Sequence, residues 1–183
     1  MFHRTSTRLA AVLLAATLPL AACVDESDTK VGETSEDLEE SVEAKENEKP
    51  SFNVEETDPK VTDKITGESV KDPAMELSYK WQGTSSSGNG SVVVVAVTNK
   101  SDAPMPVDAL TPALRYNTGD DNFKDATYIS DPEKADVDVV GIDRPLGPGA
   151  TTNAKFPFDV APGNLWDAEF TVGNVTFKGN LNN

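Results

Sequence analysis

The stretch SVVVVAVTN, residues 91–99, decides the fold of this chain. It is apolar at odd and even positions alike, so a strand formed here carries apolar side chains on both faces. This pattern is typical of a central strand that its surroundings cover on both sides or nearly so. Pro104 and Pro106 follow, and proline cannot donate a hydrogen bond to a sheet. We therefore expect a central strand that ends before these prolines.

Other short segments alternate apolar and polar residues, which predicts strands with one buried face. The clearest alternations are residues 76–81, 154–160 and 166–172, and weaker ones are residues 110–116, 126–130 and 136–142. Residues 83–90, GTSSSGNG, are predicted to be a linker, and Gly173-Asn174 predicts a two-residue hairpin turn into a last strand. No segment after Ala74 repeats its apolar residues with a helical period. About seven short strands in this length predict an all-β fold, an antiparallel β-sandwich.

The first 23 residues have a different character. Arg4 and Arg8 precede an uncharged run of 14 residues, Leu9 to Ala22. A positive region followed by a short apolar region predicts a secretory signal. The run is shorter than the roughly 20 residues that a membrane-spanning helix needs.

Leu20-Ala21-Ala22-Cys23 resembles the lipobox of bacterial lipoproteins. The resemblance implies cleavage before Cys23 and attachment of a diacylglycerol, with palmitate as the expected acyl chain, to its thiol. Two acyl chains give stable membrane anchoring, whereas one gives marginal anchoring. The alternative is an ordinary secreted protein in which the single cysteine is incidental or buried.

Acidic residues dominate the segment that follows. The net charge of the chain is −15, and residues 24–76 hold 18 Asp and Glu against 6 Lys. Low hydrophobicity with high net charge predicts a disordered linker over residues 23–73. It is expected to be a solvated spacer, and the alternative is an interaction segment for a basic partner. Nucleic acid is not an expected partner, because phosphate binding needs clustered Lys and Arg.

Composition restricts the chemistry of the processed chain. The one histidine is His3 and the one cysteine is Cys23, so cleavage before Cys23 removes the only imidazole, and lipidation uses the only thiol. Cysteine or serine–histidine nucleophiles and the usual zinc ligands are therefore not expected. We predict no enzyme activity, no catalytic residues, no metal and no cofactor.

Short motifs in the last two thirds of the chain resemble a known domain. They are V-x-N-x-S at Val97 to Ser101, L-x-P-G at Leu146 to Gly149, and an aromatic-acid-V-x-P motif at Phe158 to Pro162. Together they look like the immunoglobulin-like domain of the immunoprotective-extracellular type in bacterial surface lipoproteins, a family largely of unknown function. That family often has an acid after the last glycine of L-x-P-G, where this chain has Ala150. The resemblance implies an immunoglobulin-like sandwich and no catalytic residues.

Several side chains are candidates for a site, each with a structural alternative. Asp120, Asp121 and Asp125 offer oxygen ligands for calcium, although such clusters usually form turns. Asp136, Asp138 and Asp143 are expected on the solvated face of a strand. Trp81 and Trp166 are predicted to pack in the core, with stacking on sugar rings as the alternative. Residues 85–87, three serines, lack a base partner. No carboxylate pair with the spacing of a glycosidase is evident.

The sequence thus predicts a signal peptide at residues 1–22, lipidated Cys23 with a disordered linker over residues 23–73, and an immunoglobulin-like domain over residues 74–183. We expect a lipoprotein on the extracytoplasmic face of the cell membrane that binds another envelope protein or component through sheet edges or loops. The alternatives are a carrier of a small ligand or metal ion for a transporter, and a hydrolase of wall polymers. Both alternatives need a concave pocket.

Overall fold

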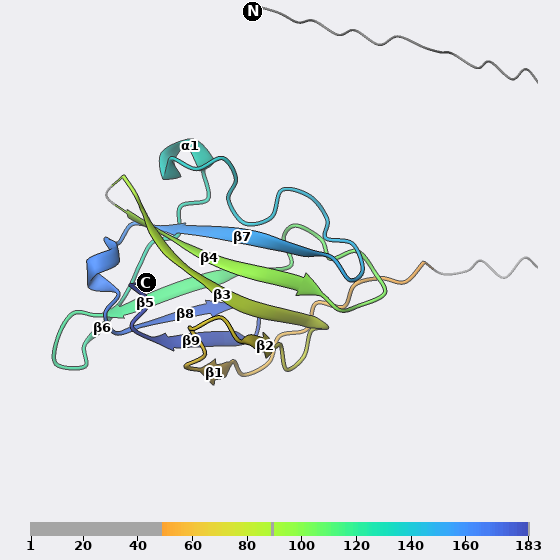
Figure 1. Cartoon of the computed structure of the whole chain (residues 1–183), viewed down its shortest axis with the longest axis horizontal. Helices are drawn as coiled ribbons and strands as arrows, with labels where there is room; N and C mark the ends of the chain where they lie inside the picture. The colour runs from red at the N-terminus through yellow and green to blue at the C-terminus, as the bar shows by residue number, and fades with distance from the viewer. Residues whose placement is uncertain (1–48, 89, 183) are drawn as a thin grey trace, which may run out of the picture. The chain divides into compact units, whose positions relative to one another are not determined.

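A computed structural model describes residues 49–88 and 90–182 (Figure 1). All of them belong to one compact unit. The predicted signal peptide, Cys23 and the part of the predicted linker up to residue 48 lie outside the described residues. Within the described residues, no helix is long and apolar enough to cross a membrane.

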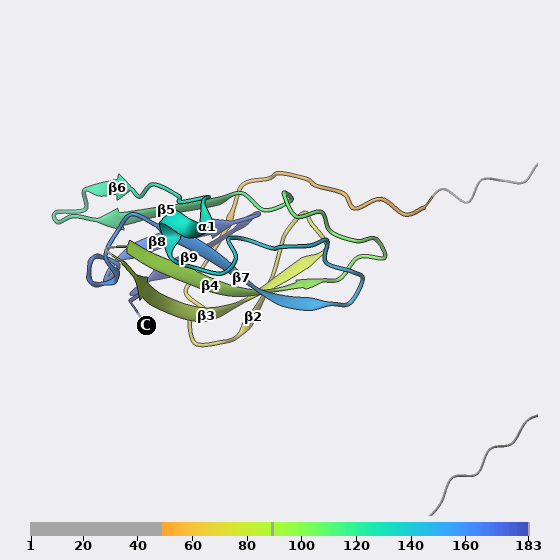
Figure 2. The ribbon, with the colours of Figure 1, turned by 90° about the horizontal axis from the view of Figure 1, so that it is seen from above.

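Two packed sheets form the domain, as the sequence predicted (Figures 1 and 2). The first sheet has the order β2 (Ser69–Lys71), β3 (Leu77–Ser87), β4 (Gly90–Asn99), β7 (Thr151–Phe158). The second has the order β1 (Lys60–Thr62), β9 (Val175–Gly179), β8 (Ala168–Val172), β5 (Pro112–Asn117), β6 (Phe123–Asp125). A four-residue helix, α1 (Pro132–Ala135), and a 3₁₀ turn, η1 (Pro162–Asn164), lie in connections.

The strand order is that of an immunoglobulin-like sandwich. From β3 to β9 the chain has seven strands, of which the first, second and fifth share one sheet and the other four share the second sheet. This corresponds to the A-B-E and C′-C-F-G sheets of immunoglobulin domains. The pairs among these seven strands are antiparallel, whereas β1 adds to β9 in parallel. The predicted fold is confirmed, with β1 and β2 as additional strands.

Strand β4 lies at the centre of its sheet, between β3 and β7. Val93, Val95 and Val97 are fully buried on its inner face, and burying each stabilises the fold by about 1.5–3 kcal/mol. On its outer face Val92 is buried, and Val94, Ala96 and Thr98 are half-buried. The prediction of a strand with two apolar faces is confirmed, and the inner face packs in the core.

The folded unit begins earlier than the sequence predicted. Residues 49–73 were assigned to the disordered linker, yet β1 and β2 lie within them. Val70 of β2 is buried in the core, while Val61 of β1 is exposed. Strands of three residues are too short to show a period of two. Their stability comes from partner strands elsewhere in the chain, so local composition alone indicated a linker.

Two further expectations are corrected. Residues 83–90 were predicted to be a linker, but β3 continues through Ser87 and β4 begins at Gly90. A register shift between Trp81 and Gly83 hid the alternation. Conversely, residues 126–130 and 136–142 contribute only isolated bridges. Asp136 caps α1 in the left-handed conformation, with a φ of 51°, so an extended strand does not start there.

Candidate functional site

A buried carboxylate lies beside the turn between β8 and β9. The Asp72 side chain accepts hydrogen bonds from the backbone N–H groups of Ala74 and Met75 at 2.9 and 2.8 Å. The Tyr79 hydroxyl donates to it at 3.0 Å. The backbone and side-chain amides of Asn174 donate at 3.0 and 2.9 Å. A buried carboxylate needs this degree of hydrogen bonding to remain ionised.

The same contacts set the protonation of the Asp72 carboxyl and of the Tyr79 hydroxyl. Burial alone would raise the pKa of Asp72, but hydrogen bonds from Asn174, Ala74 and Met75 outweigh it and hold the pKa below its ordinary value. Burial, and then the neighbouring Asp72 charge, raise the pKa of Tyr79. Asp72 is thus an anion and Tyr79 a neutral donor at neutral pH.

Asn174 also holds the segment that leads into the domain, residues 54–59, which we call the strap. Its side-chain amide donates to the Glu55 carbonyl at 2.8 Å, and its side-chain oxygen accepts from the Thr57 N–H at 2.8 Å. The Lys60 N–H donates to the Asn174 carbonyl at 2.9 Å. The strap is therefore fixed to the β8–β9 turn by one side chain.

Glycine is required next to Asn174. Gly173 has a φ of 54°, as the first central residue of a type II′ hairpin turn requires. A Cβ at this position would lie 2.2 Å from the Tyr79 hydroxyl and 2.9 Å from an Asp72 oxygen. The predicted two-residue turn is confirmed. The Tyr79 hydroxyl lies so close to the turn that position 173 has no room for a Cβ, which explains the glycine there.

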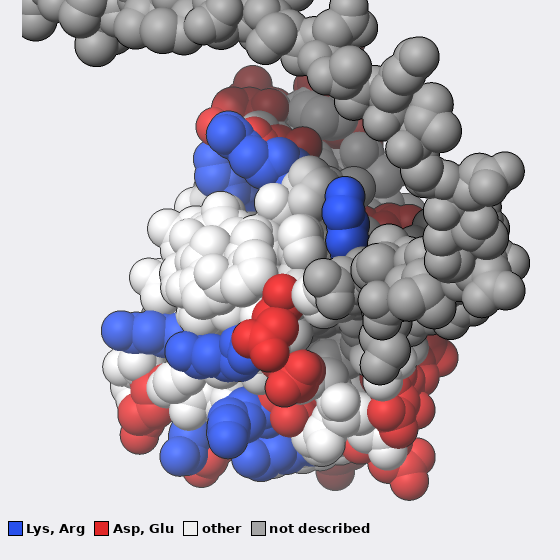
Figure 3. Space-filling model, turned by 90° about the vertical axis from the view of Figure 1, so that its right-hand side faces the viewer, with Lys and Arg blue, Asp and Glu red and all other residues white. Residues whose placement is uncertain are grey.

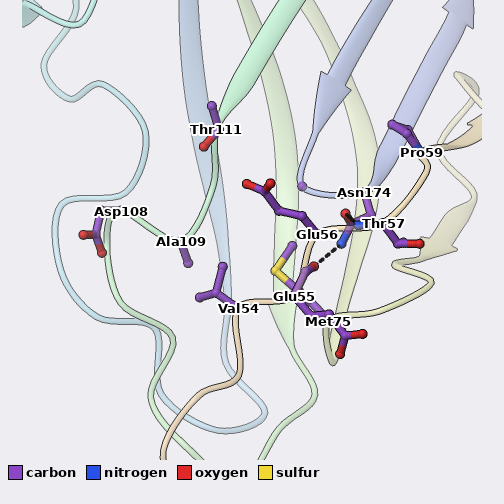
Figure 4. Close-up of a pocket in the computed structure, with 11 residues that line it drawn as sticks. Val54, Glu55, Glu56, Thr57, Pro59, Met75, Asp108, Ala109, Thr111 and Asn174 are labelled. Atoms are coloured by element: carbon purple, nitrogen blue, oxygen red, sulfur yellow. Dashed lines mark hydrogen bonds between the residues drawn. The ribbon is translucent and has the colours of Figure 1, made fainter.

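The strap forms one wall of a pocket of about 360 Å³, the strap pocket. Its lining residues are Val54, Glu55, Glu56, Thr57, Pro59, Met75, Asp108, Ala109, Thr111, Gly173 and Asn174. Figure 4 shows the Glu56 carboxylate reaching into the space between the strap and Thr111, while the Glu55 carboxylate points away. Met75 and Ala109 provide apolar surface beside it.

A second pocket of about 360 Å³, the seam pocket, lies beside the first. Its lining residues are Val107, Asp108, Leu110, Thr111, Pro112, Tyr128, Val140, Gly141, Ile142 and Phe156. Asp108 and Thr111 line both pockets, so the segment 107–111 separates them. The seam pocket is mainly apolar, and burial raises the pKa of its Tyr128.

The two pockets also carry exposed apolar side chains. Val54 is 51% exposed and Val107 is 45% exposed, and among the described residues only Val61 and Trp166 are also large, apolar and exposed. No Lys or Arg among the described residues lines either pocket. Figure 3 shows the end of the domain at which β4 terminates as an uncharged area between groups of charged side chains.

A second buried network joins two of the sequence motifs. Asn99, fully buried, donates from its side chain to the carbonyls of Ala103 and Leu146 at 2.7 and 2.8 Å. Its side-chain oxygen accepts from the Ser101 N–H and hydroxyl at 2.9 and 2.7 Å. The Gly149 N–H donates to the Asn99 carbonyl at 2.9 Å. The V-x-N-x-S and L-x-P-G motifs thus form one structural unit. Because the Asn99 side chain is buried, it offers no functional group to a ligand at the surface.

The three aspartates considered for calcium do not converge. Asp120 and Asp121 occupy a turn, and Asp125 ends strand β6. Among the described residues, no group of three or more His, Cys, Asp or Glu side chains is placed to hold a metal ion. Asp120 and Asp121 both have positive φ, 50° and 57°, which is unfavourable for any residue with a Cβ.

Replacing Asp121 with glycine is expected to stabilise the domain by about 0.5 kcal/mol, because relief of the left-handed backbone exceeds the entropy that glycine adds to the unfolded chain. Asp125→Gly, in a strand, is the control and is expected to destabilise. Chemical denaturation of the purified chain measures both. Equal destabilisation by the two variants would contradict the strain at position 121.

The other three candidate aspartates, Asp136, Asp138 and Asp143, lie at the surface but not on a strand. Asp138 forms an ion pair with Lys155, and Asp143 pairs with Arg144 at 3.1 Å. These cations lower the pKa of both carboxyls. The third, Asp136, caps α1. The three are solvated, as predicted, although the strand predicted to carry them is absent from the described residues.

The two tryptophans have different environments. Trp81 is buried, with ring centroids 6.1 Å from Phe170 and 5.5 Å from Phe177, so its predicted core packing is confirmed. Trp166 is 53% exposed, and its predicted core packing is wrong. Strand β8 begins only at Ala168, after η1, so the alternation does not extend back to residue 166.

The serine run and the sheet edges offer little for recognition. Ser87 donates to the Ala135 carbonyl beside α1. The outer edge of β7 is covered, since Ile129 donates to the Pro157 carbonyl at 2.9 Å and Gly141 to the Lys155 carbonyl at 2.7 Å. The edge strands β1, β2 and β6 have three residues each, and short edges resist pairing with other chains. Strand β3 extends past β2, which pairs only with Ser78 to Lys80.

Sequence reasoning did not identify Asp72, Glu56 or Asn174 as a group. Asp72 precedes Pro73 and accepts from the next N–H groups, a turn pattern typical of aspartate. That local signal was available, but the approach of the strap to Asn174 was not. The chain matches no protein-family profile, no curated protein and no solved structure.

Proposed function

We propose that this chain is a lipoprotein anchored through Cys23 to the extracytoplasmic face of the cell membrane, where its immunoglobulin-like domain is a non-enzymatic binding module of the envelope. The observation that carries the proposal is the position of the one cysteine, directly after Leu20-Ala21-Ala22 and before an acidic segment. A thiol at this point of a signal sequence is the substrate for lipid attachment. Two acyl chains then hold the protein stably at the membrane.

The geometry of the domain supports binding through loops at one end. The strap pocket and the seam pocket lie side by side, and exposed Val54 and Val107 flank them. Exposed apolar residues around concave surfaces are typical of interaction sites. The covered edge of β7 favours these pockets over strand addition to that edge.

A carrier of a small ligand is the second candidate function. Each pocket measures about 360 Å³, near the lower end of the range for small-molecule sites. A hydrolase has less support. In the strap pocket Glu56 is directed inward and the neighbouring Glu55 outward, which is not the arrangement of two carboxylates across a cleft.

Replacing Cys23 with serine is expected to abolish lipid attachment, because a hydroxyl does not replace the thiol as lipid acceptor. Cells that produce the chain are fed labelled palmitate, and the label on the purified protein is compared with that of wild type. We expect a loss of nearly all label and release of the variant from the membrane fraction. Ser27→Ala, outside the lipobox, is the matched control. Unlabelled wild-type protein in the medium would overturn the anchor.

A further inference from the structure

We propose that the strap pocket receives a lysine or arginine side chain of a partner protein, while an apolar side chain of the same partner segment enters the seam pocket. This inference rests on the proposed binding function, but it does not depend on the lipid anchor. It assigns the ligand chemistry of this end of the domain.

Glu56 carries the charged part of the inference. Its carboxylate reaches into the strap pocket (Figure 4), and within the described residues it makes no ion pair or hydrogen bond. Asp108 also lines the pocket, although its carboxylate points away from Glu56 (Figure 4). No described Lys or Arg lies in the lining, so the charged side chains there are all acidic. A positively charged group would therefore complement the acidic lining of this pocket.

The apolar surface of the same pocket selects a cation on a long stem. Val54, Met75 and Ala109 lie along the wall, and Val54 is exposed. Lysine and arginine cover apolar surface with their methylene groups while the charged head reaches a polar partner. The Thr111 side chain lies on the side toward which Glu56 extends (Figure 4), where it adds a hydroxyl for the cationic head. A bare metal ion would leave the apolar wall unused.

The seam pocket provides the second contact. Only the segment 107–111 separates it from the strap pocket. Two residues at positions i and i+2 of one extended segment would reach both pockets, because alternate side chains point to the same face. Leu110, Ile142 and Phe156 line it, and Val107 stands exposed at its border. Burial of an apolar side chain here would remove surface that the isolated domain leaves in water.

Charge also determines which class of partner fits. Acidic residues at the pockets repel anionic lipid headgroups and nucleic-acid phosphates, both of which require basic surfaces. Because the covered edge of β7 disfavours strand pairing there, side chains are the expected means of recognition at the two pockets. The inferred partner is therefore a protein segment that carries a basic residue two positions from an apolar one.

The test is an NMR titration of the full purified chain with the peptide acetyl-Val-Gly-Lys-Gly-Val-amide, in which the lysine and the valines share one face of an extended chain. Saturable shifts are expected at the amides of residues 54–57 and 107–111. Glu56→Gln is expected to weaken binding about three- to fivefold, the magnitude of an exposed charge pair. Val107→Ser is expected to weaken it about twofold through lost apolar contact. Raising the salt concentration is expected to weaken binding further.

Controls separate this inference from its alternatives. Glu76→Gln, an exposed acid outside both pockets, is expected to leave the affinity unchanged. The peptide acetyl-Val-Gly-Glu-Gly-Val-amide is expected not to bind. Shifts elsewhere, or equal affinity for the Glu56→Gln variant, would overturn the proposal. Equal affinity for free butylamine would overturn the proposal of a partner protein and indicate a small amine ligand instead. If palmitate labelling fails, only the proposed lipid anchor is refuted. If this titration fails, only the proposed binding site is refuted.

Discussion

Replacement of Asp72 with alanine is expected to lower the free energy of unfolding by about 4 kcal/mol. The side chain accepts five hydrogen bonds, from Ala74, Met75, Tyr79 and twice from Asn174. Its loss would leave the buried Tyr79 hydroxyl and the Asn174 backbone N–H without an acceptor, and the Asn174 side-chain amide with only the Glu55 carbonyl. Chemical denaturation of wild type and variant at pH 7 measures the difference.

The sign of the pH dependence follows from the lowered pKa of Asp72. A carboxyl whose pKa is lower in the folded than in the unfolded state stabilises the fold above the unfolded value, 3.8. That contribution disappears as the pH falls through the folded-state pKa. The stability difference between wild type and Asp72→Asn should therefore stay constant from neutral pH to about pH 5 and shrink below about pH 4.

A matched control isolates the effect. Asp63 is exposed and its side chain makes no hydrogen bond within the described residues, so Asp63→Asn is expected to change the free energy of unfolding by less than about 0.5 kcal/mol. A stability difference for Asp72→Asn that persists unchanged at pH 2 would contradict the role of the carboxylate charge.

The Asp72 network also bears on the binding site. Asn174 is held by Asp72 and in turn holds Glu55 and Thr57 of the strap. The wall of the strap pocket therefore depends on a buried network of the opposite sheet. In variants of Asp72, shifts at the strap amides should accompany the loss of stability.

Replacement of Asn99 with alanine is expected to cost about 3 kcal/mol. The change removes the donor from the buried carbonyls of Ala103 and Leu146, and the acceptor from Ser101. A denaturation midpoint shift without a change in slope would show that stability alone has changed. Breaking a buried hydrogen-bond network is among the few causes of large single-residue effects.

Asn153 on the neighbouring strand β7 provides the comparison. It is exposed, pairs in register with Ala96 of β4, and its side chain makes no hydrogen bond within the described residues. Asn153→Ala is expected to change stability by less than about 0.5 kcal/mol. Equal losses for the two asparagine variants would contradict the role of the Asn99 side chain.

Local patterns were sufficient where a strand is long and its burial is regular. Residues 91–99 predicted the central strand, residues 76–81 predicted the start of β3, and Gly173-Asn174 predicted the last hairpin. In each case the apolar period or the turn residues are determined by neighbours close in sequence. The antiparallel β-sandwich followed from the number of such segments, and its immunoglobulin-like type from the resemblance of the short motifs.

Patterns failed where the decisive partner is distant or the strand boundary shifts. Trp166 continues the alternation of β8 in sequence, but η1 ends just before it and turns its side chain to solvent. Strand β1 has an exposed valine at its centre and is held by β9, more than 100 residues away. No local signal distinguishes such a segment from an acidic linker.

The amino-acid sequence by itself determined the class of fold, the central strand and the last hairpin, because side-chain alternation and turn chemistry act over a few residues. Only the tertiary structure determined where the folded unit begins and which residues form the two pockets. The strap pocket unites residues 54–59, 108–111 and 173–174, and the hydrogen bonds of Asp72 and Asn174 bring the first and last of these together. Contacts between segments so far apart depend on the packing of both sheets, which no single stretch of the chain encodes.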